Sequence, residues 1–157
     1  MSIVLVRVDD RLIHGQVVVG WVRALGAARI VLVDDGVAEN EWERELYTLS
    51  VPPGLAVEFA TVEQAVGQFA DWIAAPERTI LLVGDVDTIV RLCHRSGEIK
   101  QVNVGGLHDA TARSQRLEYV YLSDEEAAEL RKLNENGVEV TAQDVPTARP
   151  VPLGEFA

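Results

Sequence analysis

Short runs of apolar residues alternate along the chain with longer segments in which apolar residues recur every three or four positions. The short runs are rich in valine, isoleucine and leucine and have few polar interruptions, as expected for strands that are covered on both faces. The pattern therefore predicts buried strands. They span Ile3–Val8, Ile30–Val33, Ala56–Ala60, Thr79–Val83, Gln101–Val104, Leu117–Leu122 and Val138–Gln143.

The longer segments have the period of helices with one buried face. Thr61 with Gln64, and Ser123 with Glu126, have the spacing of a capping box at the start of a helix. Glycines follow three of these segments closely and are typical helix stops. The predicted helices span Gln16–Leu25, Glu41–Ser50, Val62–Ile73, Asp87–Arg95 and Asp124–Asn136.

Strands that alternate with helices indicate an α/β fold built from right-handed crossovers around a mainly parallel sheet. Val138–Gln143 alternates apolar and polar residues, so we expect an edge strand there. Gly105–Arg116 has no helical pattern and is predicted to be a long loop, a feature that is often functional. The proline-containing tail from Val145 is expected to be irregular.

Length and charge narrow the possible functions. The chain has 157 residues, which suits one domain over residues 1–157, and its net charge of −11 disfavours nucleic acid as a partner. Cys93 is the single cysteine, so no disulfide is expected and a reducing compartment is favoured. No apolar run approaches the roughly 20 residues of a membrane span, and no leader pattern precedes the first strand. We therefore expect a cytoplasmic protein.

The residues after the predicted strands carry the candidate chemistry, because ligands of parallel sheets bind beyond the carboxyl ends of the strands. These residues form four loops, in which aspartates and glycines are also ordinary turn formers. An arginine and a histidine in the first loop are not required by a turn. The loops are Asp9–Gln16, Asp34–Gly36, Gly84–Asp85 and Gly105–His108.

His14 is the main candidate, because it precedes a predicted helix and is followed by Gly15. A helix N-terminus attracts anions, and a neutral imidazole is a competent nucleophile toward phosphorus. Arg11 would stabilise a phosphoryl group on the ring, and Asp10 could hold one ring nitrogen protonated. The alternatives are an ordinary loop histidine and a surface ion pair of Arg11 with Asp9 or Asp10.

Several other residues have two interpretations each. Asp34 and Asp35 suit a turn or helix cap better than catalysis, and His94 beside Cys93 suits the end of a helix. Gly105 and Gly106 permit an unusual backbone and could also contact phosphate. For His108 the sequence does not decide between an ordinary loop residue and a residue of the site. Three tryptophans fall on helical stripes and are expected in the core or in an interface; they are Trp21, Trp42 and Trp72.

The sequence RVDDRLIHGQV at residues 7–17, followed by Trp21, resembles the active-site signature of a known family. The family comprises the IIB components of the mannose/fructose/sorbose class of the phosphoenolpyruvate-dependent sugar phosphotransferase system (PTS). The resemblance extends in order through the rest of the chain. Its further segments are Val33–Ala38, Pro52–Gly54, Val102–Gly106, Leu133–Asn134, Gly137–Glu139 and Val145–Pro146.

The resemblance implies a three-layer fold with six or seven strands, and a phosphocarrier that needs no cofactor or metal. It implies that His14 takes phosphoryl from a IIA domain and passes it to a sugar carried by membrane IIC and IID subunits, with Arg11 and Asp10 assisting. It also implies a possible homodimer and a cytoplasmic location against the inner membrane face, through those subunits. Residues expected around the phosphate are Gly15, Gln16, Gly84, Asp35, Gly105 and Gly106.

Two departures from the family pattern concern this phosphate site. Gly84-Asp85 stands where members often have a hydroxyl residue and a proline, so only a backbone N–H at Gly84 could replace the hydroxyl contact. Asp34-Asp35 stands where members often have Asn-Asp, and the added charge would make the phosphoryl group easier to lose.

Two other functions stay open from the sequence. One is a regulatory module that is phosphorylated at the same residue but serves no transporter. The other is a Mg²⁺-dependent phosphohydrolase that uses the carboxylates of Asp9, Asp10, Asp34 and Asp35, since hard cations select oxygen ligands.

Overall fold

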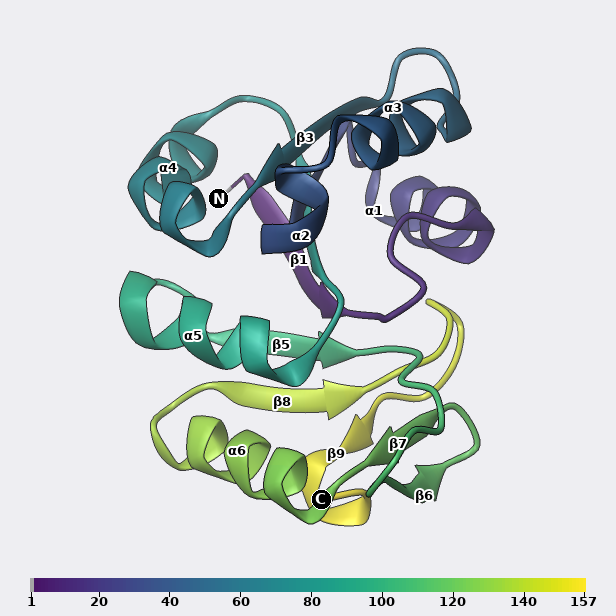
Figure 1. Ribbon diagram of the computed structural model, residues 1–157, viewed down its shortest axis with the longest axis vertical. Coiled ribbons are helices and arrows are strands. Elements are labelled where there is room, and N and C mark those ends of the chain that lie inside the picture. The colour runs from purple at the N-terminus through teal and green to yellow at the C-terminus, as the bar shows by residue number, and fades with distance from the viewer. Residues whose placement is uncertain (1) are drawn as a thin grey trace.

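The computed structural model describes residues 2–157 and gathers seven strands into one sheet (Figure 1). The first six strands in spatial order run parallel, and the seventh pairs antiparallel with the sixth. The predicted mainly parallel α/β sheet with an antiparallel edge is therefore confirmed. In spatial order the strands are β3 (Ala56–Ala60), β2 (Arg29–Val33), β4 (Thr79–Val83), β1 (Ile3–Val8), β5 (Gln101–Val104), β8 (Glu139–Ala142) and β9 (Val151–Pro152).

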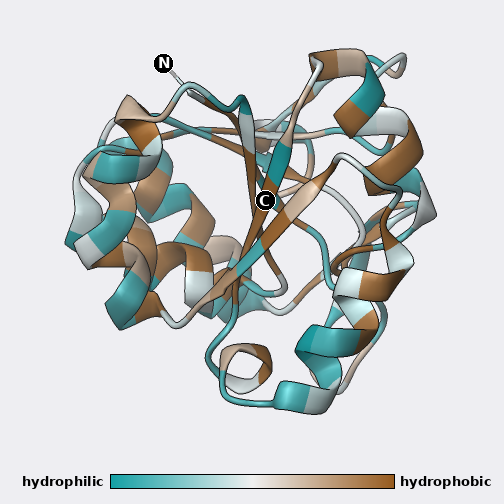
Figure 2. Cartoon of the chain, turned by 90° about the horizontal axis from the view of Figure 1, so that it is seen from above, coloured by the Kyte–Doolittle hydropathy of each residue, from teal (hydrophilic) through white to brown (hydrophobic). Residues whose placement is uncertain are grey.

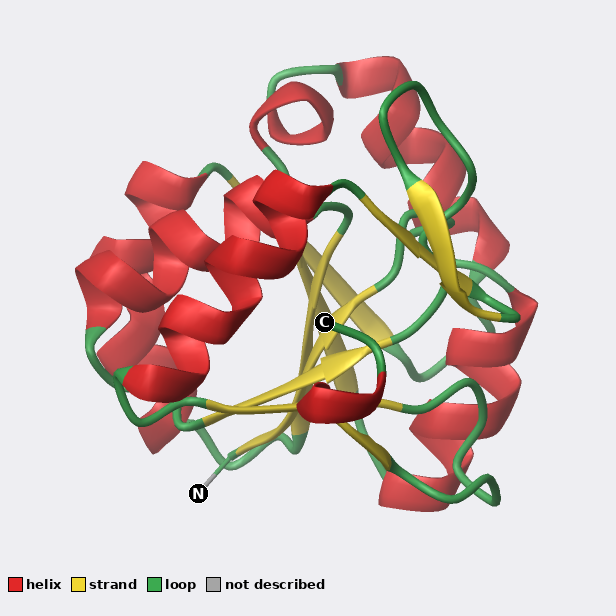
Figure 3. Ribbon diagram, turned by 90° about the horizontal axis from the view of Figure 1, so that it is seen from below, coloured by secondary structure: helices red, strands yellow, loops and turns green. Residues whose placement is uncertain are grey.

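Helices cover both faces of the sheet and complete three layers (Figure 3). One face carries η1 (Gln16–Val22), α1 (Arg23–Leu25), α2 (Asp35–Ala38) and α3 (Glu41–Ser50). The other carries α4 (Val62–Ala74), α5 (Val86–Ser96) and α6 (Asp124–Glu135). A short 3₁₀ turn, η2 (Leu153–Glu155), follows β9.

The core divides between the two sheet faces because successive strand side chains point in opposite directions. Ile30 and Leu32 of β2 pack toward η1 and α3, while Val31 and Val33 pack toward the opposite helices, and all four are fully buried. Figure 2 shows the hydrophobic stretches on the strands and on the inner sides of the helices. Each such side chain contributes about 1.5–3 kcal/mol on burial, so the central strands form a rigid base for the loops at their ends.

Helix ends follow the capping signals of the sequence. Thr61 and Ser123 each form a complete capping box, at α4 and α6 respectively. Asp85 caps α5, which begins at Val86, and Gly97 ends it with a left-handed φ of 67°. The predicted helix boundaries are therefore correct to within one or two residues.

The first helix differs from the predicted α-helix. Residues Gln16–Val22 form a π-helix, and only Arg23–Leu25 are α-helical. Four valines occupy the seven π-helical positions, and β-branched side chains crowd a regular α-turn. Short π-helical stretches are frequent at functional sites.

The last third of the chain departs most from the sequence predictions. Leu117–Leu122 is not one strand of the main sheet but the end of a separate hairpin, formed by β6 (Ser114–Leu117) and β7 (Val120–Leu122). The strand predicted at Val138–Gln143 is observed as β8, but it lies inside the sheet and not at its edge. The edge is β9, which comes from the tail that was expected to be irregular.

The three tryptophans have different environments. Trp21 and Trp72 are buried, and the Trp21 ring centroid lies 4.8 Å from the guanidinium carbon of Arg7. Trp42 is 67% exposed, so a core role for it is wrong and an interface role stays a prediction. Within residues 2–157, no helix has both the length and the apolar character that crossing a membrane requires.

Candidate active site

The site forms where three neighbouring parallel strands end at the same level. Val8 of β1 pairs with Val83 of β4 and with Val104 of β5. Beyond this row, the backbone N–H of Asp9 donates to the Val83 carbonyl at 2.9 Å, and Gly105 donates to the Val8 carbonyl at 2.7 Å. The loops that follow the three strands are therefore fixed at one edge of the sheet.

Arg7 is a fully buried cation at the base of the site. Its Nη1 donates to Asn103 and to the Gln143 carbonyl, and its Nη2 donates to Asp9 Oδ2 at 3.1 Å and to the Asp144 carbonyl at 3.0 Å. Burying a charge is tolerable only with such partners. Arg7 thereby joins β1, β5 and the segment after β8 under the first loop.

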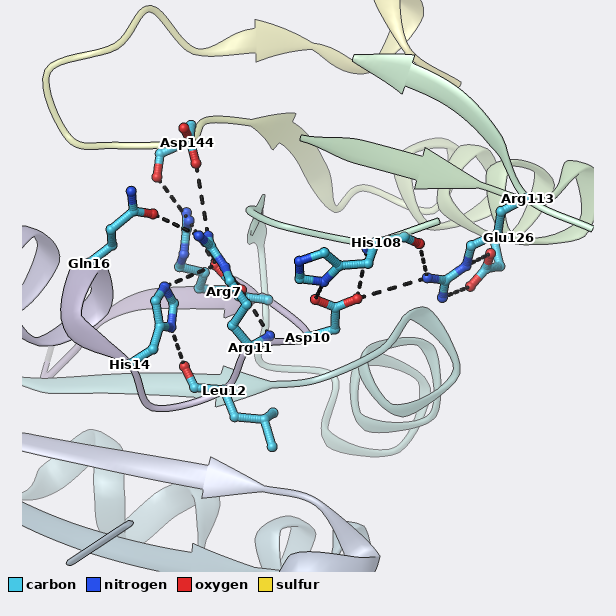
Figure 4. Close-up of polar contacts among 11 residues, drawn as sticks. Arg7, Asp10, Arg11, Leu12, His14, Gln16, His108, Arg113, Glu126 and Asp144 are labelled. Atoms are coloured by element: carbon cyan, nitrogen blue, oxygen red, sulfur yellow. Dashed lines mark hydrogen bonds and ion pairs between the residues drawn. The ribbon is translucent and has the colours of Figure 1, made fainter. Parts of the chain in front are cut away.

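Arg11 lies beside Arg7 (Figure 4) and makes a bidentate interaction with Asp9. Its Nε and Nη2 donate to the two carboxylate oxygens at 2.9 and 2.8 Å, and its Nη1 donates to Gln16 Oε1 at 2.8 Å. A guanidinium has five N–H donors. Three are used here, so two remain for an incoming anion, although Nη2 also lies 3.9 Å from Asp144.

Arg7, Asp9 and Arg11 form a cluster of charges that stabilise one another. Burial alone would raise the pKa of Asp9, but hydrogen bonds from Arg11 and the charge of Arg7 outweigh burial and lower it. Burial lowers the pKa of Arg7, and Asp9 partly offsets that effect. The hydrogen bonds from Arg11 to Asp9 raise the pKa of Arg11. With one carboxylate between two guanidiniums, this cluster presents one net positive charge to a ligand.

Gly105 and Gly106 make room for the two guanidiniums. A Cβ at Gly105 would lie 2.2 Å from Arg7 Nη2 and 2.7 Å from Asp9 Oδ2. A Cβ at Gly106 would lie 2.9 Å from Arg11 Nε. The glycine pair is therefore explained by the close approach of the arginines, whereas its predicted contact with phosphate stays a prediction.

His14 lies next to the Arg11–Asp9 pair, at the start of η1 (Figure 4). Its Nε2 is 4.0 Å from Asp9 Oδ2, and its Nδ1 is 2.8 Å from the Leu12 carbonyl oxygen. A carbonyl only accepts, so Nδ1 carries the proton and Nε2 the lone pair. Leu12 has a left-handed φ of 58°, which is uncommon for a residue with a side chain and typical of functional loops.

Asp10 does not contact His14, so its expected role in orienting that ring is wrong for this arrangement. Its Oδ1 pairs with Nδ1 of His108, and its Oδ2 accepts from the His108 backbone N–H at 2.7 Å. The reason is strand periodicity, because neighbouring residues at the end of β1 point to opposite sides. Asp9 points back to Arg7 and Arg11, and Asp10 points away from them.

The other predicted residues lie around the same edge with different contacts. Gly15 is the N-cap of η1, which has no side-chain cap. Gly84 leaves space for Leu12, since a Cβ there would lie 2.8 Å from Leu12 Cδ2. Asp34 caps α2, and Asp35 accepts from the Val62 backbone N–H and pairs with Arg91.

These contacts separate the carboxylates that a Mg²⁺ site would have to combine. Asp9 binds Arg7 and Arg11, whereas Asp10 and Asp35 each serve a different partner. Among residues 2–157, no group of three or more histidine, cysteine, aspartate and glutamate side chains could hold a metal ion. The geometry therefore does not favour the phosphohydrolase interpretation.

Sequence reasoning passed over Arg7, Asn103 and Asp144 as parts of the site. A usable signal existed for Arg7, because a buried strand that carries an arginine two residues before an aspartate places both on one face. The contributions of Asn103 and Asp144 depend on how distant segments meet, and no local pattern indicated them.

Comparison with known proteins identifies the family. Over residues 3–157 the sequence matches the family described as PTS system sorbose subfamily IIB component. The chain belongs to this family. The N-acetylgalactosamine-specific phosphotransferase enzyme IIB component 1 of Escherichia coli (strain K12) is 35% identical to this IIB chain over 147 residues, covering 92% of each.

A fused relative and a solved structure extend the comparison. The mannose-specific EIIAB component of Escherichia coli (strain K12) is 33% identical over 147 residues, which cover 94% of this IIB chain but 46% of that protein. The crystal structure of the IIB domain of the sorbose permease from Klebsiella pneumoniae superposes on this chain with a TM-score of 0.89 and 29% sequence identity. The match covers 99% of this chain and 96% of the sorbose permease domain.

Family membership establishes the reaction class. IIB components are phosphotransferases that pass a phosphoryl group to a sugar, and this chain is one of them. Such components work with a IIA component and with membrane IIC and IID components. The family predicted from residues 7–17 is therefore confirmed, together with the fold and the reaction class.

Proposed function

We propose that His14 is the residue of this IIB component that carries the phosphoryl group. A phosphohistidine on a IIA domain donates the group, and a sugar bound by IIC and IID receives it. The observation that carries the proposal is the Arg11–Asp9 pair beside His14 Nε2. Such transfer depends on position and on charge stabilisation, and Arg11 with its two free donors supplies both.

The first step is an in-line exchange between two imidazoles. The P–N bond to the donor ring breaks, a P–N bond to His14 forms, and the donor nitrogen recovers its lone pair. In the resting arrangement Nε2 is buried and Nδ1 is bound to the Leu12 carbonyl. We therefore propose that the ring turns away from Leu12 when the IIA domain docks.

Positive charge near His14 offsets part of the negative charge that a phosphoryl group would bring. A phosphohistidine adds roughly 1.5 to 2 negative charges, by analogy with other phosphorylated side chains. The Arg7–Asp9–Arg11 cluster carries one net positive charge next to the ring. Asp144, at 3.9 Å from Arg11 Nη2, counteracts part of that charge and favours onward release of the phosphoryl group.

The test uses phosphorylated IIA as the donor and follows acid-labile label on this protein. Wild type takes up the label, His14→Ala does not, and the matched control His94→Ala on α5 does. Label retained by His14→Ala would refute the assignment.

The remaining partner and location assignments belong to the same proposal. We infer a single domain over residues 1–157 that lies in the cytoplasm and meets the inner membrane face through IIC and IID. Cell fractionation with and without those subunits tests the location. Sedimentation analysis tests the homodimer that the resemblance implied. A regulatory module would take up label in the same assay but fail to pass it to any sugar through membrane subunits.

A further inference from the structure

His108 is a second histidine at this edge, and its ring is held by Asp10 while its backbone is held by Asp10 and Arg113. Asp10 pairs with its Nδ1 and accepts from its backbone N–H. Arg113 Nη1 donates to the His108 carbonyl at 2.9 Å and lies 4.0 Å from Asp10 Oδ2. Arg113 is itself bound by Glu126 of α6 through two bonds of 2.9 Å.

The Asp10 contact determines which nitrogen of His108 is free. An ionised carboxylate only accepts hydrogen bonds, so Nδ1 of His108 carries the proton and Nε2 carries the lone pair. The side chain is 67% exposed, so a ligand can reach the ring. A carboxylate that holds an imidazole in this tautomer is the arrangement by which hydrolases prepare a general base.

The ring of His108 lies at the same edge of the sheet as Arg11 and His14, two residues after Gly106, which packs against the Arg11 guanidinium. Figure 4 shows the rings of His14 and His108 on opposite sides of Arg11. In-line displacement puts the attacking oxygen on the side of the phosphorus that faces away from the leaving nitrogen. For His108 to serve the attacking oxygen, that oxygen must approach a phosphoryl group on His14 from the side of Arg11 that His108 occupies.

The two half-reactions differ in their need for a base. Transfer from the IIA imidazole to His14 joins a lone pair to phosphorus and releases no proton. Transfer from His14 to a sugar uses a hydroxyl group, whose proton must leave as the P–O bond forms. Asp9 is not available for that proton, because Arg7 and Arg11 occupy its oxygens.

We propose that His108, positioned by Asp10, is the general base of the second half-reaction. The inference rests on the proposed phosphorylation of His14. The sugar oxygen attacks phosphorus, its proton passes to Nε2 of His108, and the P–N bond to His14 breaks. The His14 nitrogen recovers its lone pair, and the resulting His108 imidazolium is stabilised by Asp10 until the proton passes to water.

The charges around His108 support this role. Asp10 is the carboxylate that faces its ring, and Arg113 limits the negative potential from the opposite side. Glu126 pairs with Arg113 in turn, so the four side chains sum to one negative charge with a neutral His108 and to zero once His108 has taken up a proton, which favours proton uptake by its ring.

The experiment measures the two half-reactions separately. His108→Gln, Asp10→Asn and the control His94→Gln are each labelled by phosphorylated IIA. Each labelled protein is then added to membrane vesicles that hold IIC and IID. The acceptors are N-acetylgalactosamine, mannose, fructose and sorbose, the sugars of the relatives.

We expect His108→Gln to slow sugar phosphorylation about 10²-fold to 10⁴-fold, the usual contribution of a general base, with little change in the rate of labelling. Asp10→Asn should slow the same step, and Asp10→Glu should restore part of the rate. His94→Gln should match wild type in both steps.

Two results would overturn the inference. One is an equal loss of both steps in His108→Gln, which would indicate a structural role. The other is sugar phosphorylation at the wild-type rate. If wild type itself takes no label on His14, the proposed function fails first, and this result is distinguishable because it precedes the second step.

Discussion

Replacing Gly105 by alanine tests whether the glycine exists to admit the buried guanidinium of Arg7. The added Cβ would lie 2.2 Å from Arg7 Nη2, 2.4 Å from Arg7 Cζ and 2.7 Å from Asp9 Oδ2. Arg7 cannot move aside, because it is fully buried and its two terminal nitrogens are bound to four different residues. The substitution must therefore break the Arg7–Asp9 pair or displace the backbone.

Breaking a buried ion pair costs about 3–5 kcal/mol, because each charge loses its partner. A domain of this size loses about 2–4 °C in Tm for each kcal/mol, so the expected fall is roughly 6–20 °C. The assay is urea and thermal unfolding followed by circular dichroism. A matched control is Gly67→Ala in α4, where no atom lies within 4 Å of the new Cβ and alanine should stabilise the helix by about 0.5–1 kcal/mol. Unfolding of Gly105→Ala within about 1 kcal/mol of wild type would refute the reasoning.

Three further predictions follow from the same contacts. Gly106→Ala should push Arg11 aside, slowing the labelling of His14 by phosphorylated IIA and destabilising the fold less than Gly105→Ala, because Asp9 keeps its contact with Arg7; unchanged labelling would contradict this. The pKa of Asp9 is lower in the folded chain than its unfolded value of about 3.9, so its charge stabilises the fold above that pH, and the contribution is lost as the pH falls through the folded pKa. Asp9→Asn should therefore flatten the acid side of the stability profile measured by urea unfolding, and an unchanged slope would be evidence against the pair. Burial raises the pKa of Cys93 to about 12, so the native thiol should resist iodoacetamide at mildly alkaline pH and react once guanidinium chloride unfolds the chain; rapid native alkylation would argue against its burial.

The parallel core could be predicted from sequence because its strands are covered on both faces. Ile30–Val33 and Thr79–Val83 are continuous apolar runs, and both lie in the middle of the sheet. Val138–Gln143 was harder to place. Its apolar and polar residues alternate, but the cause is not a position at the edge of the sheet. Glu139 and Thr141 line a groove over β5 and β8 together with Gln101, Asn103 and Gln143, so a strand inside the sheet acquires a polar face.

The hairpin around residue 118 gave no local sign of a turn. Glu118 and Tyr119 form the turn, and neither is a usual turn former. The segment is held by a distant residue, since Leu107 donates to the Tyr119 carbonyl and accepts from the Tyr121 N–H, both at 2.9 Å. A pairing of this kind depends on how the preceding loop returns to the sheet, which single-sequence patterns do not contain.

The site was predictable at the level of the loop but not at the level of individual contacts. The position of His14 and Arg11 after the first strand followed from general rules for parallel sheets. The choice of Asp10 as the partner of His14 did not follow, because two adjacent aspartates at a strand end point to opposite sides. The structure assigns Asp9 to the arginines and Asp10 to His108.

The acceptors of Arg7 have a consequence for how the protein is made. Two of them are the carbonyls of Gln143 and Asp144, 136 and 137 residues further along the chain. During synthesis the ribosome exposes Arg7 long before either carbonyl exists, so this cation must stay hydrated while most of the sheet is translated. The loop that carries His14 can therefore reach its final form only after the C-terminal segment has left the exit tunnel, and a prematurely terminated chain would carry the signature residues without a working site.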